Sequence, residues 1–409
     1  MTVRIDADLL LSGRGEPIDH GTVILDGRQI TYAGPVSGAP ADAGPADASV
    51  PVAMPGLWDC HIHFGMPTPD EFDKTEFTSP ATMGARAVDE LGRVLDAGVT
   101  SVREVGGVGI DLVGEIEAGR IRSPHMYGAG GIMSPTAGHA DTHSIPLRMV
   151  EAGADQYGFM FNVADGVPGV IKAVRKNLRR NAKVIKICTS GGVMSEVDHW
   201  SHQQYADEEI TAIVEEAARA ERFVAAHAEG KAGIMAALRC GVQTIEHGDE
   251  IDDEVVELML EKDIILVPTM WITRQLMAMP DEMPDYAYRK LSELAEIQDD
   301  GLAKAVAAGV RIAMGTDTFV HGPLYGTNSL EIAHLVEVGM TPLAAVEAAT
   351  ATGPETLGPQ APRSGQLREG YDADVIALDF NPLEDVSGWG DPDRVTHVWQ
   401  AGRPVKAPA

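Results

Sequence analysis

Short runs of β-branched and other apolar residues alternate with helical patterns through the middle of this 409-residue chain, and this alternation constrains the fold more than any other feature. Four such runs lie at 99–103, 183–187, 223–226 and 264–267. Stretches rich in Ala and Glu lie between them, and the acidic first turn of 207–219 is typical of a helix. Repeated strand–helix units predict the α/β class, with a parallel sheet covered by helices. Because no GxGxxG fingerprint follows the first strand, we favour a (β/α)8 TIM barrel over a doubly wound dinucleotide fold.

The two ends of the chain have a different pattern. Near the N-terminus, apolar runs at 22–25 and 29–34 flank an Asp-Gly turn, which is a hairpin signal. Near the C-terminus, 374–378 and 395–399 also indicate strands. We therefore predict a small β-sandwich domain formed from both termini. The predicted domains are residues 1–54 with 360–409 for the β-sandwich and residues 55–359 for the barrel.

Charge and cysteine content narrow the function classes. The chain has 61 Asp and Glu against 32 Lys and Arg, so its net charge of −29 repels phosphate backbones and anionic lipid surfaces. We therefore expect no nucleic-acid and no membrane partner. Cys60, Cys188 and Cys240 form no CxxC pair and cannot build a disulfide framework, which suits a reducing compartment. With no signal-like N-terminus and no apolar stretch of roughly 20 residues, we expect a cytoplasmic protein.

His61 and His63 form a His-x-His pair after the segment 56–60. Alternate residues of a strand point to the same side, so the pair can offer two imidazoles to one metal ion. Taken alone this is a weak signal, because two histidines with ordinary structural roles are the commoner explanation.

Three further strand ends carry similar side chains. His227 closes the run 223–226, His247 closes a run that begins at Val242, and Asp317 follows 311–316. In a barrel the carboxyl ends of all strands meet on one face, where the active site forms. Imidazole and carboxylate groups are ligands for zinc and similar divalent ions. Each residue alone fits a loop histidine or a helix N-cap, but their convergence favours a metal site.

Lys186 lies inside the apolar strand 184–187. Burial disfavours its ammonium form, so its pKa should fall, and nearby divalent ions would lower that pKa further. A neutral amine can add carbon dioxide and become a carbamate whose two oxygens could bridge two metals. The alternative is a lysine whose stem packs while its ammonium group reaches solvent. Lys183 competes for the role, but its odd offset places it on the opposite strand face.

These segments together resemble the amidohydrolase superfamily over nearly the whole chain. The segments that carry the resemblance are 54–63, 102–107, 185–192, 226–228, 245–248, 315–317 and 365–375. Within the superfamily the chain is most similar to the imidazolonepropionase-like group of Xaa-Pro dipeptidases and Lys/Arg carboxypeptidases, with ochratoxin-type amidases as close relatives.

The resemblance implies a binuclear metal centre and an amide hydrolase. His61, His63 and Asp317 would hold the first divalent ion, His227 and His247 the second, and carboxylated Lys186 would bridge them. Zinc is the expected metal. A shared hydroxide would attack the scissile carbonyl, and Asp317 would pass its proton to the leaving amine.

The resemblance also suggests substrate contacts. His139 matches a histidine that related enzymes place by the substrate, and we name it as a catalytic and binding candidate. Glu229 stands where relatives often carry His or Tyr, which suggests a preference for a cationic side chain; pointing into solvent or capping the next helix is the alternative. Tyr205 and His321, like His143, lie on expected active-face loops. Tyr205 and His321 are further candidates, although ordinary loop roles are simpler.

The expected substrate is a dipeptide or N-acyl amino acid, or another small molecule. Two alternatives stay open: a cyclic-amide hydrolase or deaminase on the same scaffold, and a non-catalytic homologue. Lys186 disfavours the deaminase, since many deaminases of this superfamily use one metal and lack the lysine. The presence of all six ligand positions disfavours the non-catalytic protein. By the same resemblance we expect a homo-oligomer.

Overall fold

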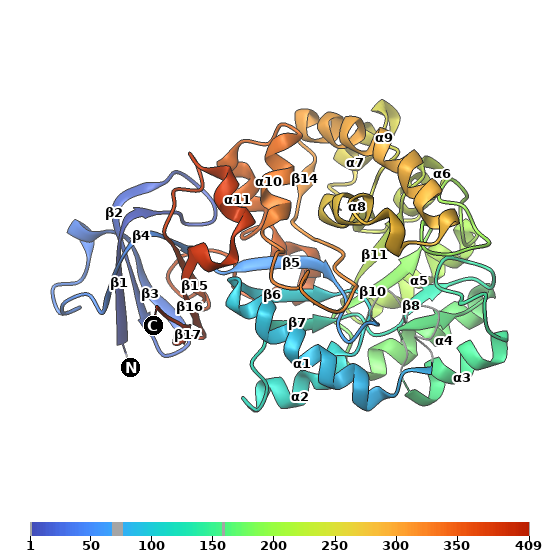
Figure 1. Ribbon diagram of the computed structural model, residues 1–409, viewed down its shortest axis with the longest axis horizontal. Helices are drawn as coiled ribbons and strands as arrows, with labels where there is room; N and C mark the ends of the chain where they lie inside the picture. The colour runs from blue at the N-terminus through green and yellow to red at the C-terminus, as the bar shows by residue number, and fades with distance from the viewer. Residues whose placement is uncertain (1, 68–76, 158–159, 409) are drawn as a thin grey trace.

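The computed structural model describes residues 2–67, 77–157 and 160–408. A helix-covered barrel makes up most of it, and a sheet built from both ends of the chain lies at one side (Figure 1). Within the described ranges, no helix is both long and apolar enough to cross a membrane.

Within those ranges, eight parallel strands form the barrel wall. In order, they are β5 (Leu57–Ile62), β6 (Val99–Glu104), β7 (His125–Gly128), β10 (Val184–Cys188), β11 (Phe223–Ala228), β12 (Thr244–His247), β13 (Ile265–Val267) and β14 (Arg311–Ile312). Two backbone seams close the ring: the amide of Lys183 donates to the carbonyl of Gly128 at 2.9 Å, and the amide of Cys60 donates to the carbonyl of Met314 at 2.9 Å. The predicted TIM barrel is confirmed.

Two short strands extend the wall beside β10. They are β8 (Ile132–Ser134), which pairs with β10, and β9 (Phe161–Val163), which pairs with β8. At the closing seam, β14 is shorter than the predicted run 311–316. The amide of Met314 donates to the carbonyl of Ala348, outside the strand ladder, at 2.9 Å, so regular pairing ends early.

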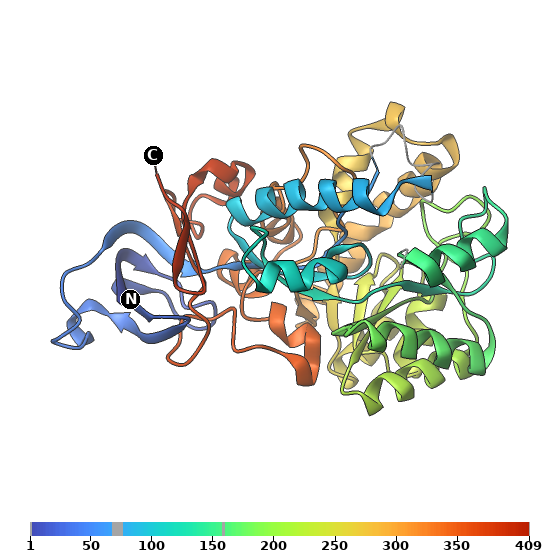
Figure 2. The ribbon, with the colours of Figure 1, turned by 90° about the horizontal axis from the view of Figure 1, so that it is seen from below.

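Helices cover the outside of the barrel (Figures 1 and 2). They are α1 (Pro80–Asp96), α2 (Gly109–Glu117), α3 (Leu147–Tyr157), α4 (Gly166–Arg179), α5 (Asp207–Arg219), α6 (Lys231–Arg239), α7 (Asp253–Glu261), α8 (Met270–Met277), α9 (Asp285–Ala308), α10 (Leu330–Glu337) and α11 (Pro342–Ala348). Short 3-10 turns occur at Val36–Gly38, Pro280–Glu282, Gly353–Gln360, Val386–Gly390 and Pro392–Arg394.

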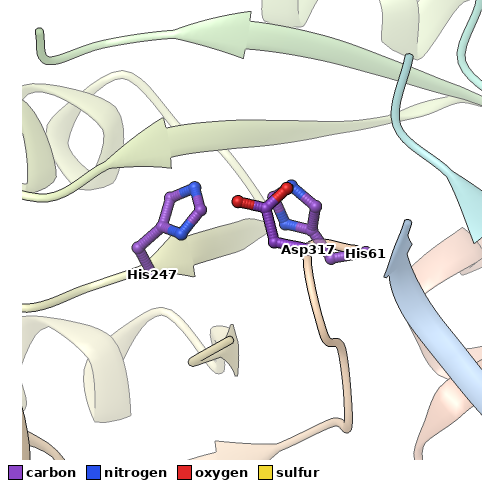
Figure 3. Close-up of side chains that lie close together, drawn as sticks. All are labelled: His61, His247 and Asp317. Atoms are coloured by element: carbon purple, nitrogen blue, oxygen red, sulfur yellow. The ribbon is translucent and has the colours of Figure 1, made fainter. Parts of the chain in front are cut away.

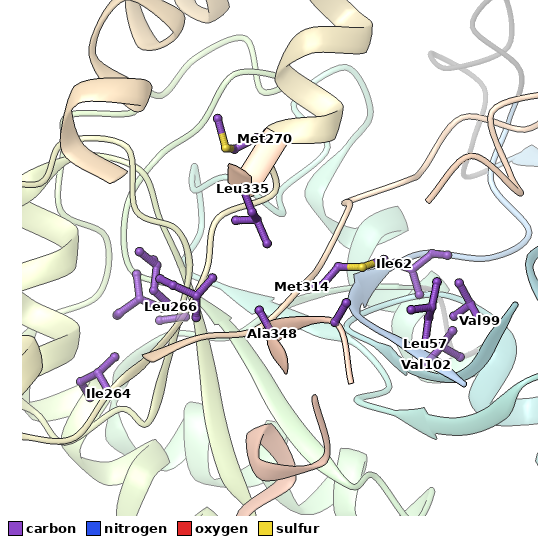
Figure 4. Packing of buried hydrophobic residues seen from close by; sticks show 14 of the residues in the cluster. Leu57, Ile62, Val99, Val102, Ile264, Leu266, Met270, Met314, Leu335 and Ala348 are labelled. Atoms are coloured by element: carbon purple, nitrogen blue, oxygen red, sulfur yellow. The ribbon is translucent and has the colours of Figure 1, made fainter. Parts of the chain in front are cut away.

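Helix α1 shows how local sequence and packing agree. The hydroxyl of Ser79 accepts a hydrogen bond from the amide of Thr82 at 3.2 Å and so caps the first turn of the helix. Pro80 fits the first helical position because proline has no amide hydrogen that would need an acceptor there. Buried residues recur at helical spacing along one face, at Met83, Ala87, Leu91, Val94 and Leu95. Figure 4 shows the interior that such faces and the strands build, with Leu57, Val99 and Val102 among its members.

The second sheet joins both ends of the chain. Its strand order is β17-β16-β15-β4-β1-β2-β3, from β1 (Thr2–Leu10), β2 (Ile18–Asp26), β3 (Gln29–Pro35), β4 (Ala48–Pro55), β15 (Val375–Leu378), β16 (Val395–Gln400) and β17 (Arg403–Lys406). Strand β15 pairs antiparallel with β4, so the C-terminal segment completes the N-terminal one. This is the sheet of the predicted β-sandwich; the boundaries at 54/55 and 359/360 stay a prediction.

Strand alternation gives this sheet two apolar faces. Val375 and Ala377 pack in the sheet's own core, whereas Ile376 and Leu378 belong to the cluster that continues into the barrel. Because neighbouring residues of a strand point to opposite faces, β15 attaches the terminal sheet to the barrel.

Candidate active site

The six side chains predicted as metal ligands lie together at the carboxyl ends of the barrel strands. His61 belongs to β5, His227 to β11 and His247 to β12. The ring centroids of His61 and His247 are 5.0 Å apart, and those of His227 and His247 are 4.6 Å apart. These three histidines and the other three predicted ligands, His63, Lys186 and Asp317, line one cavity of about 120 Å³.

Asp317 faces the histidines of β5. Its Oδ1 lies 3.0 Å from Nε2 of His63 and 3.4 Å from Nε2 of His61. The ligand atoms of His61, His247 and Asp317 all lie within 4.8 Å of one another (Figure 3). This spacing suits the ligands of a divalent-metal centre.

One ring nitrogen of each of the four imidazoles lies within hydrogen-bond distance of a protein group, which leaves the other ring nitrogen available to bind a metal ion. Nδ1 of His61 lies 2.9 Å from Glu246 Oε2, and Nδ1 of His63 lies 2.7 Å from the carbonyl of Gly106. Nδ1 of His247 lies 2.7 Å from Thr269 Oγ1. In the same way, Nε2 of His227 lies 3.0 Å from the carbonyl of Gly191. Such hydrogen bonds orient metal-binding histidines.

Burial lowers the pKa of His61, His227 and His247, and neighbouring cationic groups lower it further. Neutral imidazole is the form that binds a metal, so no proton has to be removed first. His247 and Asp317 also have positive φ angles of 69° and 57°. These backbone conformations are unfavourable for residues other than glycine and are common at functional sites.

Lys186 has the least usual environment of the six. Its side chain is buried, and its Nζ has no hydrogen-bond partner among the residues that the structure describes. Burial lowers the pKa of Lys186, although the carboxylate of Glu246 opposes this effect. An unsatisfied buried amine is costly, so the surroundings fit a lysine whose nitrogen bears an additional group and faces metal ions. Lys183, the competing residue, instead donates to Asn181 Oδ1 at 3.3 Å.

His139 lies against the cluster. Its ring stacks on that of His227, with centroids 4.2 Å apart and an interplanar angle of 11°. Nδ1 of His139 is 2.9 Å from Ser195 Oγ and 3.8 Å from Asp198 Oδ2. Burial lowers the pKa of His139, and the carboxylate of Asp198 acts in the opposite direction. The structure therefore brings His139 to the cavity.

Glu229 also lines the cavity and is 6% exposed, so it does not point into solvent. Its Oε2 is buried without a hydrogen-bond partner in the described part of the chain. Burial raises the pKa of Glu229 well above its usual range, and the carboxylates of Asp249 and Asp198 raise it further. Asp249 lies in the same wall, where its Oδ1 accepts from Gln298 Nε2 at 2.6 Å.

Tyr205 and His321, the other two residues predicted to contact substrate, are not among the described residues that line this cavity, and substrate contact by either stays a prediction. Tyr205 belongs to the main hydrophobic cluster instead, and its backbone has a positive φ of 58° shortly before α5 begins. Nδ1 of His321 is 2.6 Å from Glu90 Oε1, so the buried carboxylate of α1 holds this histidine away from the cavity.

Several residues of the site were not predicted from the sequence. Glu246 binds His61, and Arg103 Nη2 donates to both carboxylate oxygens of Glu246 at 2.7 and 2.8 Å. The sequence signal that could have identified them is a charged residue inside an otherwise apolar strand, Arg103 in β6 and Glu246 in β12. No such signal in the sequence marks the apolar residues that line the cavity. They include Ile132, Met160, Val193, Ile272, Leu276, Leu291, Leu294 and Phe319.

Comparison with known proteins agrees with this geometry. The chain is 43% identical to ochratoxinase from Aspergillus niger over 422 aligned positions, which cover 99% of this chain and 86% of ochratoxinase. The crystal structure of that ochratoxinase matches with a TM-score of 0.91 at 41% identity, covering 100% of this chain and 96% of the other. A prolidase complexed with N-methylphosphonate-L-proline matches with a TM-score of 0.91 at 32% identity, covering both chains completely.

A Xaa-Pro dipeptidase with bound methionine also covers both chains completely, with a TM-score of 0.88 at 28% identity. The profile of the amidohydrolase family matches residues 52–405. The family resemblance seen in the sequence is therefore confirmed. The chain belongs to the amidohydrolase family and is a metal-dependent hydrolase that acts on amide bonds.

Proposed function

We propose that this protein is a binuclear hydrolase that cleaves the amide bond of a dipeptide or an N-acyl amino acid. His61, His63 and Asp317 would hold one divalent ion and His227 and His247 a second, with zinc as the expected metal. Lys186, carboxylated by carbon dioxide, would bridge the pair. The observation that carries the proposal is that Nζ of Lys186 is buried among these imidazoles and has no hydrogen-bond partner in the described part of the chain.

When bound, the metal ions supply a hydroxide nucleophile and polarise the scissile carbonyl. The chain's own groups manage protons and position. Oδ1 of Asp317 lies within 3.4 Å of Nε2 of both His61 and His63. From this position Asp317 would take a proton and deliver it to the leaving amine. His139, whose ring stacks on that of His227, would lie beside the substrate.

The residues that line the cavity favour a substrate with an apolar part and an amine-bearing part. Methionine, isoleucine, leucine and phenylalanine side chains form much of the lining, among them Met160, Ile272 and Phe319. The lining also contains the carboxylates of Glu229 and Asp249. Oε2 of Glu229 has no hydrogen-bond partner among the described residues, and a cationic substrate group next to it would relieve the repulsion between these carboxylates. The similarity to an ochratoxinase and to a prolidase also favours a substrate in which an amide bond joins an acyl group to an amino acid.

A panel of substrates tests the proposal. Zinc-loaded protein is incubated with dipeptides, including Xaa-Pro, Xaa-Lys and Xaa-Arg, with N-acyl amino acids of aromatic and cationic side chains, and with cyclic amides. Release of a free amino acid from a dipeptide or N-acyl amino acid is the expected result. Turnover confined to cyclic amides would contradict the proposal and favour the cyclic-amide hydrolase.

A further inference from the structure

Lys290 on α9 is buried among backbone carbonyls of the loop 191–205. Its side chain is 7% exposed, and its Nζ donates to the carbonyls of Gly192, Ser195 and Asp198 at 3.1, 2.7 and 2.6 Å. An ammonium group has three donors, so this lysine uses its full capacity on one loop. A buried cation is costly unless its hydrogen bonds are made, which indicates that α9 and the loop are held in one arrangement.

The same loop surrounds His139. Ser195 Oγ is 2.9 Å from His139 Nδ1, and the hydroxyl of Ser195 also donates to Asp198 Oδ1. Gln204 connects His139 to Asp198, since its Oε1 accepts a hydrogen bond from the amide of His139 at 2.9 Å and its Nε2 donates one to Asp198 Oδ2 at 2.8 Å. A Cβ atom at Gly192 would lie 2.3 Å from Cε1 of His139. The loop backbone therefore packs directly on the imidazole.

Helix α9 holds this loop with one face. Tyr286, Lys290 and Glu293 follow at helical spacing i, i+4 and i+7. The hydroxyl of Tyr286 donates to the carbonyl of Met194 at 3.2 Å, and Glu293 Oε2 accepts from Trp200 Nε1 at 3.1 Å. On the same helix, Leu291 and Leu294 line the cavity.

We infer that Lys290 is a positioning residue: by holding the loop 191–205 it fixes Ser195 and Asp198 against Nδ1 of His139 and so sets where that imidazole meets the substrate. The inference rests on the proposed function, in which His139 lies beside the scissile amide. A histidine displaced by about 1 Å loses on the order of 100-fold in rate, so a lysine remote from the substrate can control turnover.

The test compares Lys290→Met, Lys290→Arg and the control Lys304→Met, an exposed lysine on the same helix. For a substrate from the panel, Lys290→Met should lower kcat by about 10- to 100-fold with little change in KM and unchanged metal content. Lys290→Arg, which keeps a cation with several donors, should recover part of kcat. Hydrogen exchange should rise in 191–205 for Lys290→Met and stay at the wild-type level for Lys304→Met.

A double-mutant cycle separates positioning from general stability. In a His139→Asn background, Lys290→Met should cause little further loss of kcat, because the residue it positions is already absent. Equal losses in both backgrounds, or a kcat for Lys290→Met like that of Lys304→Met, would overturn the inference. If Lys290→Met does not fold, Ser195→Ala takes its place in the same cycle. A wild-type protein that hydrolyses no member of the panel would instead contradict the proposed function, while the exchange measurement still reports on the loop.

Discussion

Glu246 Oε2 lies 2.9 Å from Nδ1 of His61, and the same carboxylate is held by Arg103. Both charged side chains are fully buried inside the barrel. A carboxylate at this position keeps the proton on Nδ1 and directs Nε2 of His61 towards the candidate metal centre. The barrel interior therefore orients a ligand that the strand end alone would leave free to rotate.

Glu246→Gln should weaken zinc binding by about 10- to 100-fold, because the amide is a weaker acceptor for His61 and no longer neutralises Arg103. Competition with a chelator at constant pH measures the affinity. Glu257→Gln, an exposed glutamate on α7, is the control and should bind zinc as the wild type does. Equal zinc affinity in Glu246→Gln and wild type would show that this hydrogen bond does not orient a ligand.

Purified protein from zinc-supplemented medium should contain close to two divalent ions per chain, as the proposed ligand set predicts. Inductively coupled plasma mass spectrometry gives the ratio, and removal of the ions with a chelator should abolish amide hydrolysis reversibly. A folded protein that retains no metal after this preparation would refute the centre.

Lys186→Ala should abolish activity, and a short-chain carboxylic acid should restore part of it, because a small carboxylate fits the space of the missing carbamate. Activity is measured against acid concentration. Lys183→Ala serves as the control, since the side chain of Lys183 contacts Asn181 outside the cavity. Full activity of Lys186→Ala without added acid would exclude a bridging role.

Glu229→Gln should reduce kcat/KM for substrates with Lys or Arg side chains while sparing those with neutral ones, since a carboxylate that could pair with the cation is lost. Rates across matched neutral and cationic N-acyl amino acids give the comparison. Glu250→Gln is a nearby control, because Glu250 accepts from the amide of Lys231. A profile parallel to that of the wild type would rule out charge selection by Glu229.

Glu331 predicts a pH dependence of stability. Its oxygens accept hydrogen bonds from the amides of Met270 and Trp271, and burial raises the pKa of Glu331 from 4.5 to about 8. The folded chain then keeps the proton that the unfolded chain releases, so this residue makes the free energy of unfolding fall as the pH rises from about 4.5 to about 8.

Glu331→Gln should flatten that part of the pH profile. Urea unfolding at several pH values between 5 and 8 measures the free energy in the variant and the wild type. The exposed Glu296 on α9 provides the control Glu296→Gln, which should leave the slope unchanged. A variant slope equal to that of the wild type would show that Glu331 loses its proton at the same pH in the folded and unfolded states.

The sequence by itself determined the periodic features of the protein. Alternating apolar runs and helical patterns predicted the barrel because strand and helix periods are local properties, and α5 occupies the predicted residues 207–219. The six candidate ligands were also readable from the sequence. They are the polar residues that close or interrupt apolar strands, and parallel strands bring such positions to one face.

Only the tertiary structure decided which loop residues reach the cavity. His139 and Glu229 line it, whereas Tyr205 packs in the core and His321 binds Glu90, although all four lie outside the strands and helices. Arg103 and Glu246, or Lys290 and the loop 191–205, are far apart in sequence and meet through packing alone. A loop has no period that fixes the direction of its side chains, so their places depend on long-range hydrogen bonds and burial that no local pattern encodes.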